Sequence, residues 1–392
     1  DCRLIYLDNA ASTKIHDDVL ESMLPYLKEQ FGNPSSIHRY GRLAHKAIEK
    51  ARKQIASLIN ADPSEILITS GGTESNNTAL TGVVMKKSSG QIITSQIEHD
   101  AILEPCKKLS QNGFDIHYVS VDKFGLIDVS ELKNYLSEKT SIVSIMFGNN
   151  EVGTIQPVSE IVKLCHDNNT IFHTDAVQAI GKIPIDVKEL GIDLLSISSH
   201  KLYGPKGIGA LYVKNGIDID PMILGGGQES GLRSGTENVA NIVGFGKSCE
   251  IAKNNLSENL IHVKKLQNSL IEKIHNTIPK VTLNGHPQLR LPNNIHFTFL
   301  GVNGEDLIIK LDEYGVAAST GSACSVNTQK ASHVLQSMGF SLEQITGSLR
   351  LTLGIFNNEK EIEQTVEILK KIVQELRAVS PFKEKYSFTF EN

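Results

Sequence analysis

The sequence predicts an α/β protein with a large domain built on a mainly parallel sheet, followed by a smaller α+β domain. Short apolar runs alternate with helical-length segments over the first two thirds of the chain. This alternation gives way, after about residue 255, to long amphipathic helices and a strand-rich stretch. The chain has 392 residues, of which 40% are hydrophobic and 21% charged, so it is long enough to bury the cores of two domains.

The apolar runs of the first part have the length and β-branched composition of buried strands. Segments of helical length, such as 75–87 and 158–168, separate them. Strands alternating with helices in this way are typical of a parallel sheet covered by helices. The predicted strands are 66–69, 91–94, 141–146, 171–173 and 194–197.

The second part begins with a long amphipathic helix, whose apolar residues recur at helical spacing from Leu256 to Ile274. Strands are predicted at 294–298 and 348–353. A last amphipathic helix, with apolar positions from Ile362 to Leu376, follows Asn358, and Glu361 stands three residues later as in a capping box.

Charge and apolar runs exclude several classes of function. The net charge of −5 and pI of about 6.3 argue against a nucleic-acid-binding or membrane-surface protein. No apolar run is long enough to span a bilayer, and the N-terminal stretch does not resemble a secretory signal. We therefore expect a cytoplasmic protein, and the absence of an initiator Met leaves an organelle open.

The five cysteines are odd in number and form no C-x-x-C pair, which argues against a disulfide framework or a structural zinc site. Cys106, Cys165 and Cys249 stand in apolar contexts and are expected in the core, whereas Cys2 looks incidental. Cys324 lies in the small, polar segment STGSACSVNTQK, where an exposed thiol would be reactive.

The segment Ser70-Gly-Gly-Thr-Glu-Ser-Asn76 follows a predicted strand and opens a helix. Glycines there allow close approach of the backbone to a ligand, and free amides at a helix start favour a phosphate. A tight turn with a helix cap explains the same residues. The segment lacks the lysine of a nucleotide-binding P-loop, and no dinucleotide fingerprint follows a strand elsewhere.

Two further strand ends carry residues suited to a site. Asp175 ends a predicted strand, where it is either a helix cap or a carboxylate that keeps a pyridine nitrogen protonated. Lys201 follows the next strand, with Ser198 and His200 beside it as candidate phosphate donors. A lysine there is either a solvated turn residue or an amine fit for a Schiff base. A phosphate cradle, a carboxylate and a lysine at strand ends together outline a pyridoxal phosphate site.

Two residues outside this set also have open interpretations. His99 follows a strand and is either a surface or capping group, or a ring that stacks on the cofactor and moves protons. Arg350 interrupts an alternating strand and is either an outward residue or a bidentate clamp for a carboxylate.

Together these segments resemble the cysteine desulfurases, the NifS/IscS-like group of the class V aminotransferase fold. The resemblance runs from LDNAAST to SLRLTLG, and the loop around Cys324 resembles that of the long-loop subgroup. It rests on SGGTESNN, SQIEHDAILEP, FGNNEVGTIQPV, HTDAVQAIGKIPIDV, SSHKLYGPKGIGALYV, GGGQESGLRSGTENV and STGSACS. It implies a fold type I transferase with a seven-stranded sheet. The large domain would then cover residues 12–257, and the smaller one residues 1–11 and 258–392.

The resemblance also implies a role for each matching residue. Lys201 would form the Schiff base with pyridoxal phosphate, Asp175 would pair with the pyridine nitrogen, and His99 would stack on the ring. The cofactor would also contact Gln178 at the ring hydroxyl, Gly72, Thr73, Ser198 and His200 at the phosphate, and Thr236 from a second subunit. Asn33, Asn150 and Arg350 would bind the substrate, and Asn150 would also contact the cofactor. No fixed metal site is implied, and Cys324 would at most be a transient iron–sulfur ligand.

The implied activity is removal of sulfur from L-cysteine, which leaves L-alanine and a persulfide on Cys324. The sulfur would pass to acceptors such as an iron–sulfur scaffold protein, with a homodimer as the working form. A selenocysteine lyase is the main alternative, and an aminotransferase or an epimerase would share the cofactor motifs. A silent scaffold is disfavoured because Lys201, Asp175, His99 and Cys324 are all present.

Overall fold

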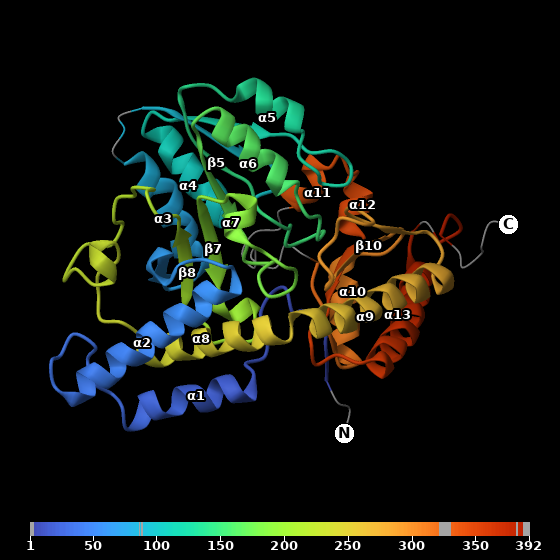
Figure 1. Cartoon of the computed structure of the whole chain (residues 1–392). Helices are drawn as coiled ribbons and strands as arrows, with labels where there is room; N and C mark the ends of the chain where they lie inside the picture. Colours follow the sequence, from blue (N-terminus) through green and yellow to red (C-terminus); the bar gives the residue numbers. More distant parts are fainter. Residues whose placement is uncertain (1–3, 86, 88, 321–330, 382, 387–392) are drawn as a thin grey trace.

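Two domains lie side by side in the computed structural model, which describes residues 4–85, 87, 89–320, 331–381 and 383–386 (Figure 1). The large domain contains a seven-stranded sheet, and the small domain contains a three-stranded and a two-stranded sheet. Helices α8 and α9 run almost end to end from one domain to the other (Figure 1). The predicted division into an α/β domain and a smaller α+β domain is confirmed.

The large sheet has the strand order β2-β8-β7-β6-β5-β3-β4. Only β8 among these seven runs antiparallel to its neighbours, so the other six end at the same edge of the sheet. The five predicted strands are confirmed, and β4 and β8 join them. The strands are β2 (Ile66–Thr69), β3 (Gln91–Ser95), β4 (Asp115–Val119), β5 (Thr140–Ser144), β6 (Ile171–Asp175), β7 (Leu194–Ser198) and β8 (Gly209–Val213).

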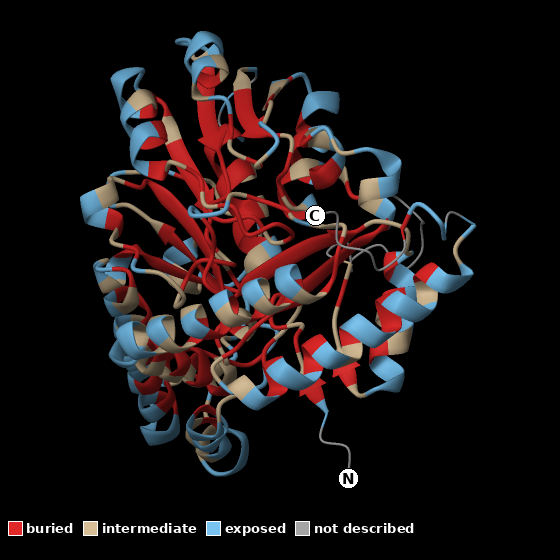
Figure 2. Cartoon of the chain, turned by 90° about the vertical axis from the view of Figure 1, so that its right-hand side faces the viewer, coloured by how far each residue is buried: buried red, intermediate tan, exposed pale blue. Residues whose placement is uncertain are grey.

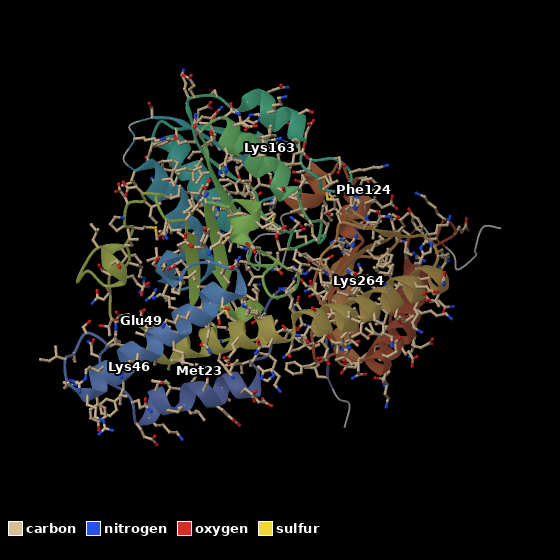
Figure 3. All side chains as sticks on the ribbon, viewed as in Figure 1. Met23, Lys46, Glu49, Phe124, Lys163 and Lys264 are labelled. Atoms are coloured by element: carbon tan, nitrogen blue, oxygen red, sulfur yellow. The ribbon has the colours of Figure 1, made fainter. Side chains whose placement is uncertain are left out.

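Helices cover both faces of this sheet, as expected for buried parallel strands. One face packs against α3 (Gly72–Val84) and α4 (Asp100–Gln111). The other face packs against α2 (Arg39–Leu58), α5 (Val129–Tyr135), α6 (Val158–Asp167), α7 (Val187–Leu190) and α8 (Val239–Asn254). Helix α1 (Asp17–Lys28) packs against α8, where Met23 lies so close to Gly244 that a side chain there would collide with its sulfur (Figure 3).

The small domain is built around β10, which pairs antiparallel with β12 and β9. The two predicted amphipathic helices are confirmed, and Asn358 with Glu361 forms the predicted capping box. The N-terminal strand β1 (Ile5–Tyr6) pairs with β11 of this domain. Its other elements are α9 (Leu256–Thr277), β9 (Val281–Leu283), β10 (Asn294–Phe299), α10 (Gly304–Glu313), β11 (Val316–Ala317), α11 (His333–Ser337), α12 (Leu342–Thr346), β12 (Ser348–Thr352) and α13 (Glu359–Val379).

Most strands of both domains are buried between helices whose outer faces are exposed, whereas β4 and β9 are partly exposed (Figure 2). Strand β5 ends two residues before its predicted end at Met146, because the Met146 amide donates to the side chain of Glu98. The domain boundary at residue 257 stays a prediction. No helix within the described ranges is long and apolar enough to cross a membrane.

Candidate active site

The carboxyl ends of the parallel strands bring most of the predicted site residues to one edge of the large sheet. The Gly72 turn follows β2, His99 follows β3, Asn150 follows β5, Asp175 ends β6 and Lys201 follows β7. Strands that share a direction end at the same edge, which is where open α/β sheets carry their ligand sites. The topology therefore explains why residues up to 129 positions apart serve one site.

Asp175 is buried and held by two donors. Its Oδ2 accepts a hydrogen bond from Asn76 Nδ2 at 2.7 Å, and its Oδ1 accepts the Val177 amide at 3.0 Å. Asn76 lies on α3 and was not identified from the sequence, although it belongs to the quoted SGGTESNN motif. The carboxylate is thereby fixed in one orientation at the end of β6.

Lys201 closes the short 3₁₀ turn Ser199–Lys201 and points to the N-terminal segment of the chain. Its Nζ donates to the carbonyl oxygens of Ala10 at 2.5 Å and Ala11 at 2.7 Å. Gln178 Nε2 donates to the same Ala10 carbonyl at 3.0 Å. The LDNAAST segment thus holds the amine beside Gln178, a contact that the sequence did not reveal because it joins positions 190 residues apart.

A second lysine lies directly behind this turn. Lys182 Nζ donates to the backbone carbonyl of Lys201 at 3.3 Å. Burial and the charge of Lys201 lower the pKa of Lys182 to about 7. Burial and the charges of the nearby lysines also lower the pKa of His200 to about 4, and His200 Nδ1 lies 3.1 Å from Ser12 Oγ. His200 is therefore neutral at pH 7, with one ring nitrogen engaged by a hydroxyl.

The first turn of α3 has the character of an anion site. Gly71 at its N-cap provides no side-chain cap, so the first amides of the helix are not closed off by a side chain. A Cβ on Gly72 would lie 2.9 Å from Val177 Cγ2, so glycine permits the close approach of this turn to the segment after β6. Thr73 is exposed at the same turn, and Ser198 is buried at the end of β7.

Glu74 stabilises this turn through its side-chain contacts. It accepts the Ser70 amide at 2.7 Å and pairs with Arg233 at 2.9 Å. Burial raises the pKa of Glu74, but the hydrogen bonds from Arg233 and Ser70 outweigh it and lower the pKa. The ion pair also ties the segment that carries Thr236 to the start of α3.

His99 caps α4, and its Nδ1 accepts the Ala101 amide at 3.0 Å. An Nδ1 that accepts a hydrogen bond carries no proton, so in the neutral ring the proton is on Nε2. The preceding Glu98 is fully buried and accepts Ser95 Oγ at 2.6 Å and the Met146 amide at 3.0 Å. Burial raises the pKa of Glu98 to about 8, although these hydrogen bonds lower it.

Arg350 extends from β12 of the small domain to the large one. Its guanidinium donates to the backbone carbonyl of Asn150 at 2.8 Å and to Asp8 Oδ1 at 3.0 Å. Arg350 is only 3% exposed, so these contacts hold it at the domain interface. The structure thus brings together two of the three predicted substrate-binding residues, and the sequence missed Asp8.

Two of the predicted residues that the structure describes are not part of this cluster. Asn33 and Thr236 are exposed, and among the described residues neither forms a hydrogen bond with the others. Cys324 lies outside the described residues, as does Cys2. The other cysteines, Cys106, Cys165 and Cys249, are buried and free as predicted. Burial raises the pKa of the Cys106 and Cys165 thiols to about 12, so neither is a reactive thiolate.

The groups that the fold brings together here fit pyridoxal phosphate. A buried carboxylate can pair with a pyridine nitrogen, an amine can reach a carbonyl carbon, and an uncapped helix start can receive a phosphate. The carboxylate is Asp175, the amine is Lys201, and the helix start is that of α3. Within the described ranges, no group of histidine, cysteine and acidic side chains could hold a metal ion.

Comparison with known proteins places the chain in a family. The sequence model described as "Aminotransferase class-V" matches residues 5–365. A cysteine desulfurase IscS of Dictyoglomus turgidum is 48% identical over 386 residues, which cover 98% of both chains. A cysteine desulfurase IscS of Methanosarcina thermophila is also 48% identical, over 98% of this chain and 95% of its own.

A solved structure supports the same family assignment. One titled "NIFS-LIKE PROTEIN" superimposes with a TM-score of 0.89 at 40% identity and covers 95% of this chain and 99% of its own. The chain therefore belongs to the class V aminotransferase family and, within it, to the cysteine desulfurases.

Proposed function

We propose that this chain removes sulfur from L-cysteine, giving L-alanine and a persulfide on Cys324. The observation that supports this most is the convergence of Asp175, Lys201 and Arg350 at one edge of the sheet, in a chain 48% identical to cysteine desulfurases over nearly its full length. A solved relative, 37% identical with a TM-score of 0.80, is described in complex with cysteine.

Pyridoxal phosphate, when bound, supplies an electron-withdrawing ring that makes the Cα proton of an amino acid acidic. Asp175 would hold the pyridine nitrogen, Gln178 the ring hydroxyl, and His99 the face of the ring. Its phosphate would be held by Gly72, Thr73, Ser198 and His200, with Thr236 of the partner subunit. These assignments are proposals, and the uncapped start of α3 and the neutral His200 support them.

The chain's own residues would then perform the proton and sulfur transfers. Arg350, with Asn150 and Asn33, would bind the substrate carboxylate, and the Lys201 amine would remove the Cα proton. The Cys324 thiolate would attack the substrate sulfur, so that an S–S bond forms as the Cβ–S bond breaks. The electron pair of that bond stays with the carbon skeleton, which takes up protons and leaves as alanine.

A homodimer is the proposed working form. Apolar side chains are exposed at the end of α1, at the start of α2, on the segment between them and on the segment before Thr236, as expected of a surface that another subunit covers. The exposed residues are Leu27, Phe31, Ile37, Tyr40 and Leu224. We propose that sulfur leaves Cys324 for an acceptor protein, such as an iron–sulfur scaffold, and that the protein works in the cytoplasm.

The test is alanine release from L-cysteine by the protein purified with pyridoxal phosphate, with a dithiol present. We expect alanine and sulfide in equal amounts. Cys324→Ala should still bind L-cysteine but release almost no alanine, whereas Cys2→Ala, the matched control, should keep the full rate. Alanine from selenocysteine alone would instead identify a selenocysteine lyase. Normal desulfuration by Cys324→Ala would refute the role of that thiol.

A further inference from the structure

Two residues at the start of α11 connect the small-domain chain to the large domain. Ser332 Oγ forms a 2.5 Å hydrogen bond with Oε2 of Glu151, and His333 Nε2 lies 2.9 Å from the carbonyl oxygen of Glu98. Both contacts cross between segments far apart in sequence, 181 and 235 residues respectively. They lie at the first described residues after position 330, only a few positions beyond Cys324 in the sequence.

The partners of these two residues stand next to proposed site residues. Glu151 directly follows Asn150, whose carbonyl receives Arg350, and Glu98 directly precedes His99. Glu151 is only 3% exposed, and its backbone is fixed by Asn149, whose Oδ1 accepts its amide, and by Asn294, which donates to its carbonyl. Burial raises the pKa of Glu151, against the lowering effect of the Ser332 hydrogen bond. A carboxyl so deeply buried needs a hydrogen-bond partner, and Ser332 provides one.

Apolar packing reinforces the same attachment. Val334, Leu335 and Met338, which follow Ser332, form a buried cluster with large-domain residues. Those residues are Ile97, Met146 and Val152, which lie in the segments that carry His99 and Asn150. The start of α11 is therefore seated on the large domain beside the site, although α11 belongs in sequence to the small domain.

The chain before Cys324 is attached equally close to the site. Ser319 and Arg350 exchange backbone hydrogen bonds, at 3.2 Å and 2.6 Å between the donor nitrogens and acceptor oxygens. Cys324 lies five residues after Ser319 and eight before Ser332. An extended chain spans at most about 3.5 Å per residue, so five residues bridge at most roughly 17 Å and eight residues at most roughly 28 Å. Both attachments are thus close to Cys324 along the chain.

We propose that Glu151, acting through Ser332, is a positioning residue that holds the start of α11, which follows Cys324 in the sequence, beside the proposed active site and so favours sulfur transfer to the thiol. This inference rests on the proposed desulfurase function. A fixed end raises the effective concentration of a tethered group at its target. Ser332 also caps α11, since its Oγ accepts the Leu335 amide at 3.1 Å, so its loss would loosen the start of that helix as well.

The test compares two steps that the proposal affects differently. Exchange of the L-cysteine Cα proton in deuterium oxide depends on Lys201 and the cofactor and does not require Cys324. Alanine and persulfide formation require the thiol to reach the substrate sulfur. We expect Ser332→Ala to slow alanine formation about tenfold and to leave Cα exchange within twofold of the wild type. Ser332→Thr, which keeps a hydroxyl, should restore the rate.

Ser341→Ala is the matched control, because Ser341 caps the neighbouring helix α12 in the same way. It should leave both rates unchanged. In a Glu151→Ala background, Ser332→Ala should slow alanine formation much less than it does in the wild type, because only its cap on α11 is then lost. Thermal unfolding should show that both variants are folded. A normal alanine rate in Ser332→Ala, or an equal fall in exchange and alanine formation, would overturn the proposal. Failure of the proposed desulfurase function would give a different result, because the wild-type protein itself would then form no alanine.

Discussion

The side-chain amide of Asn76 donates a 2.7 Å hydrogen bond to Oδ2 of Asp175, joining the second turn of α3 to the end of β6. The other carboxylate oxygen accepts the Val177 amide. Helix α3 therefore serves the site twice, because its open N-terminal turn faces the proposed phosphate and its buried side orients the proposed partner of the pyridine nitrogen. Asn76 acts through Asp175, which makes it a positioning residue.

Asn76→Ala should weaken cofactor binding, because Asp175 would lose one of its two donors while it stays buried. A hydrogen bond to a charged group contributes about 1.5–3 kcal/mol, so the Kd for pyridoxal phosphate should rise at least tenfold. Titration of the apoprotein followed by absorbance measures it. Asn77→Ala is the control, since the Asn77 side chain bonds only within α3. An unchanged Kd in Asn76→Ala would show that Asp175 is oriented without it.

Arg350→Lys should weaken binding of L-cysteine and leave the cofactor absorbance unchanged. The guanidinium donates to Asn150 and Asp8 from a planar fork, whereas a lysine has a single ammonium that cannot replace this geometry. We expect the KM for L-cysteine to rise about ten- to a hundredfold. Cysteamine, which lacks the carboxylate, should bind both proteins equally. A similar loss for both ligands would mean that Arg350 supports the domain interface only.

Much of the fold and part of the site could be predicted from the sequence. Asp175 and Lys201 were recognisable because each stands where an apolar run ends, and the carboxyl ends of parallel strands converge. The capping box of α13 was recognisable because Asn358 and Glu361 are three residues apart. The strand ends and the capping box depend on residues that are close in sequence, so the spacing of residues along the chain is enough to predict them.

The missed features depend on contacts between distant segments. Asn76, Lys182 and the Ala10 carbonyl look ordinary in sequence, and their roles appear only when the chain brings them to Asp175 and Lys201. The direction of β8 could not be predicted either, because apolar periodicity is the same for parallel and antiparallel strands. The burial of Glu98 could not be predicted for a similar reason, because the Met146 amide that donates to its carboxyl group lies 48 residues later in the sequence.

Tyr203→Phe should destabilise the contact between the Lys201 turn and the small domain. Tyr203 has a φ of 63°, uncommon for a residue other than glycine, and its hydroxyl accepts the Ile355 amide at 2.9 Å. Loss of the hydroxyl leaves that amide without its acceptor, which should lower the free energy of unfolding by about 1 kcal/mol. Urea unfolding measures this. Tyr212→Phe is the control, because no described residue bonds the Tyr212 hydroxyl, and an equal change in both variants would contradict the prediction.

Glu98 should make stability fall as the pH rises. Burial raises the pKa of its carboxyl to about 8 in the folded protein, whereas an unfolded glutamate titrates near 4.5. The folded state therefore keeps a proton that the unfolded state releases between these values. The stability that this proton provides is complete below about pH 4.5 and lost as the pH approaches 8, with a limiting slope of about 1.4 kcal/mol per pH unit.

Glu98→Gln, which is neutral at every pH, should remove this part of the pH dependence. Urea unfolding of the apoprotein at pH 5.5, 6.5 and 7.5 should show the wild type losing stability relative to Glu98→Gln at each step. Glu104→Gln serves as the control, because Glu104 is exposed on α4 and its ion pair with Lys107 is long at 3.9 Å. It should follow the wild type. Parallel curves for the wild type and Glu98→Gln would mean that Glu98 is already ionised at pH 5.5, with the Ser95 and Met146 hydrogen bonds outweighing its burial.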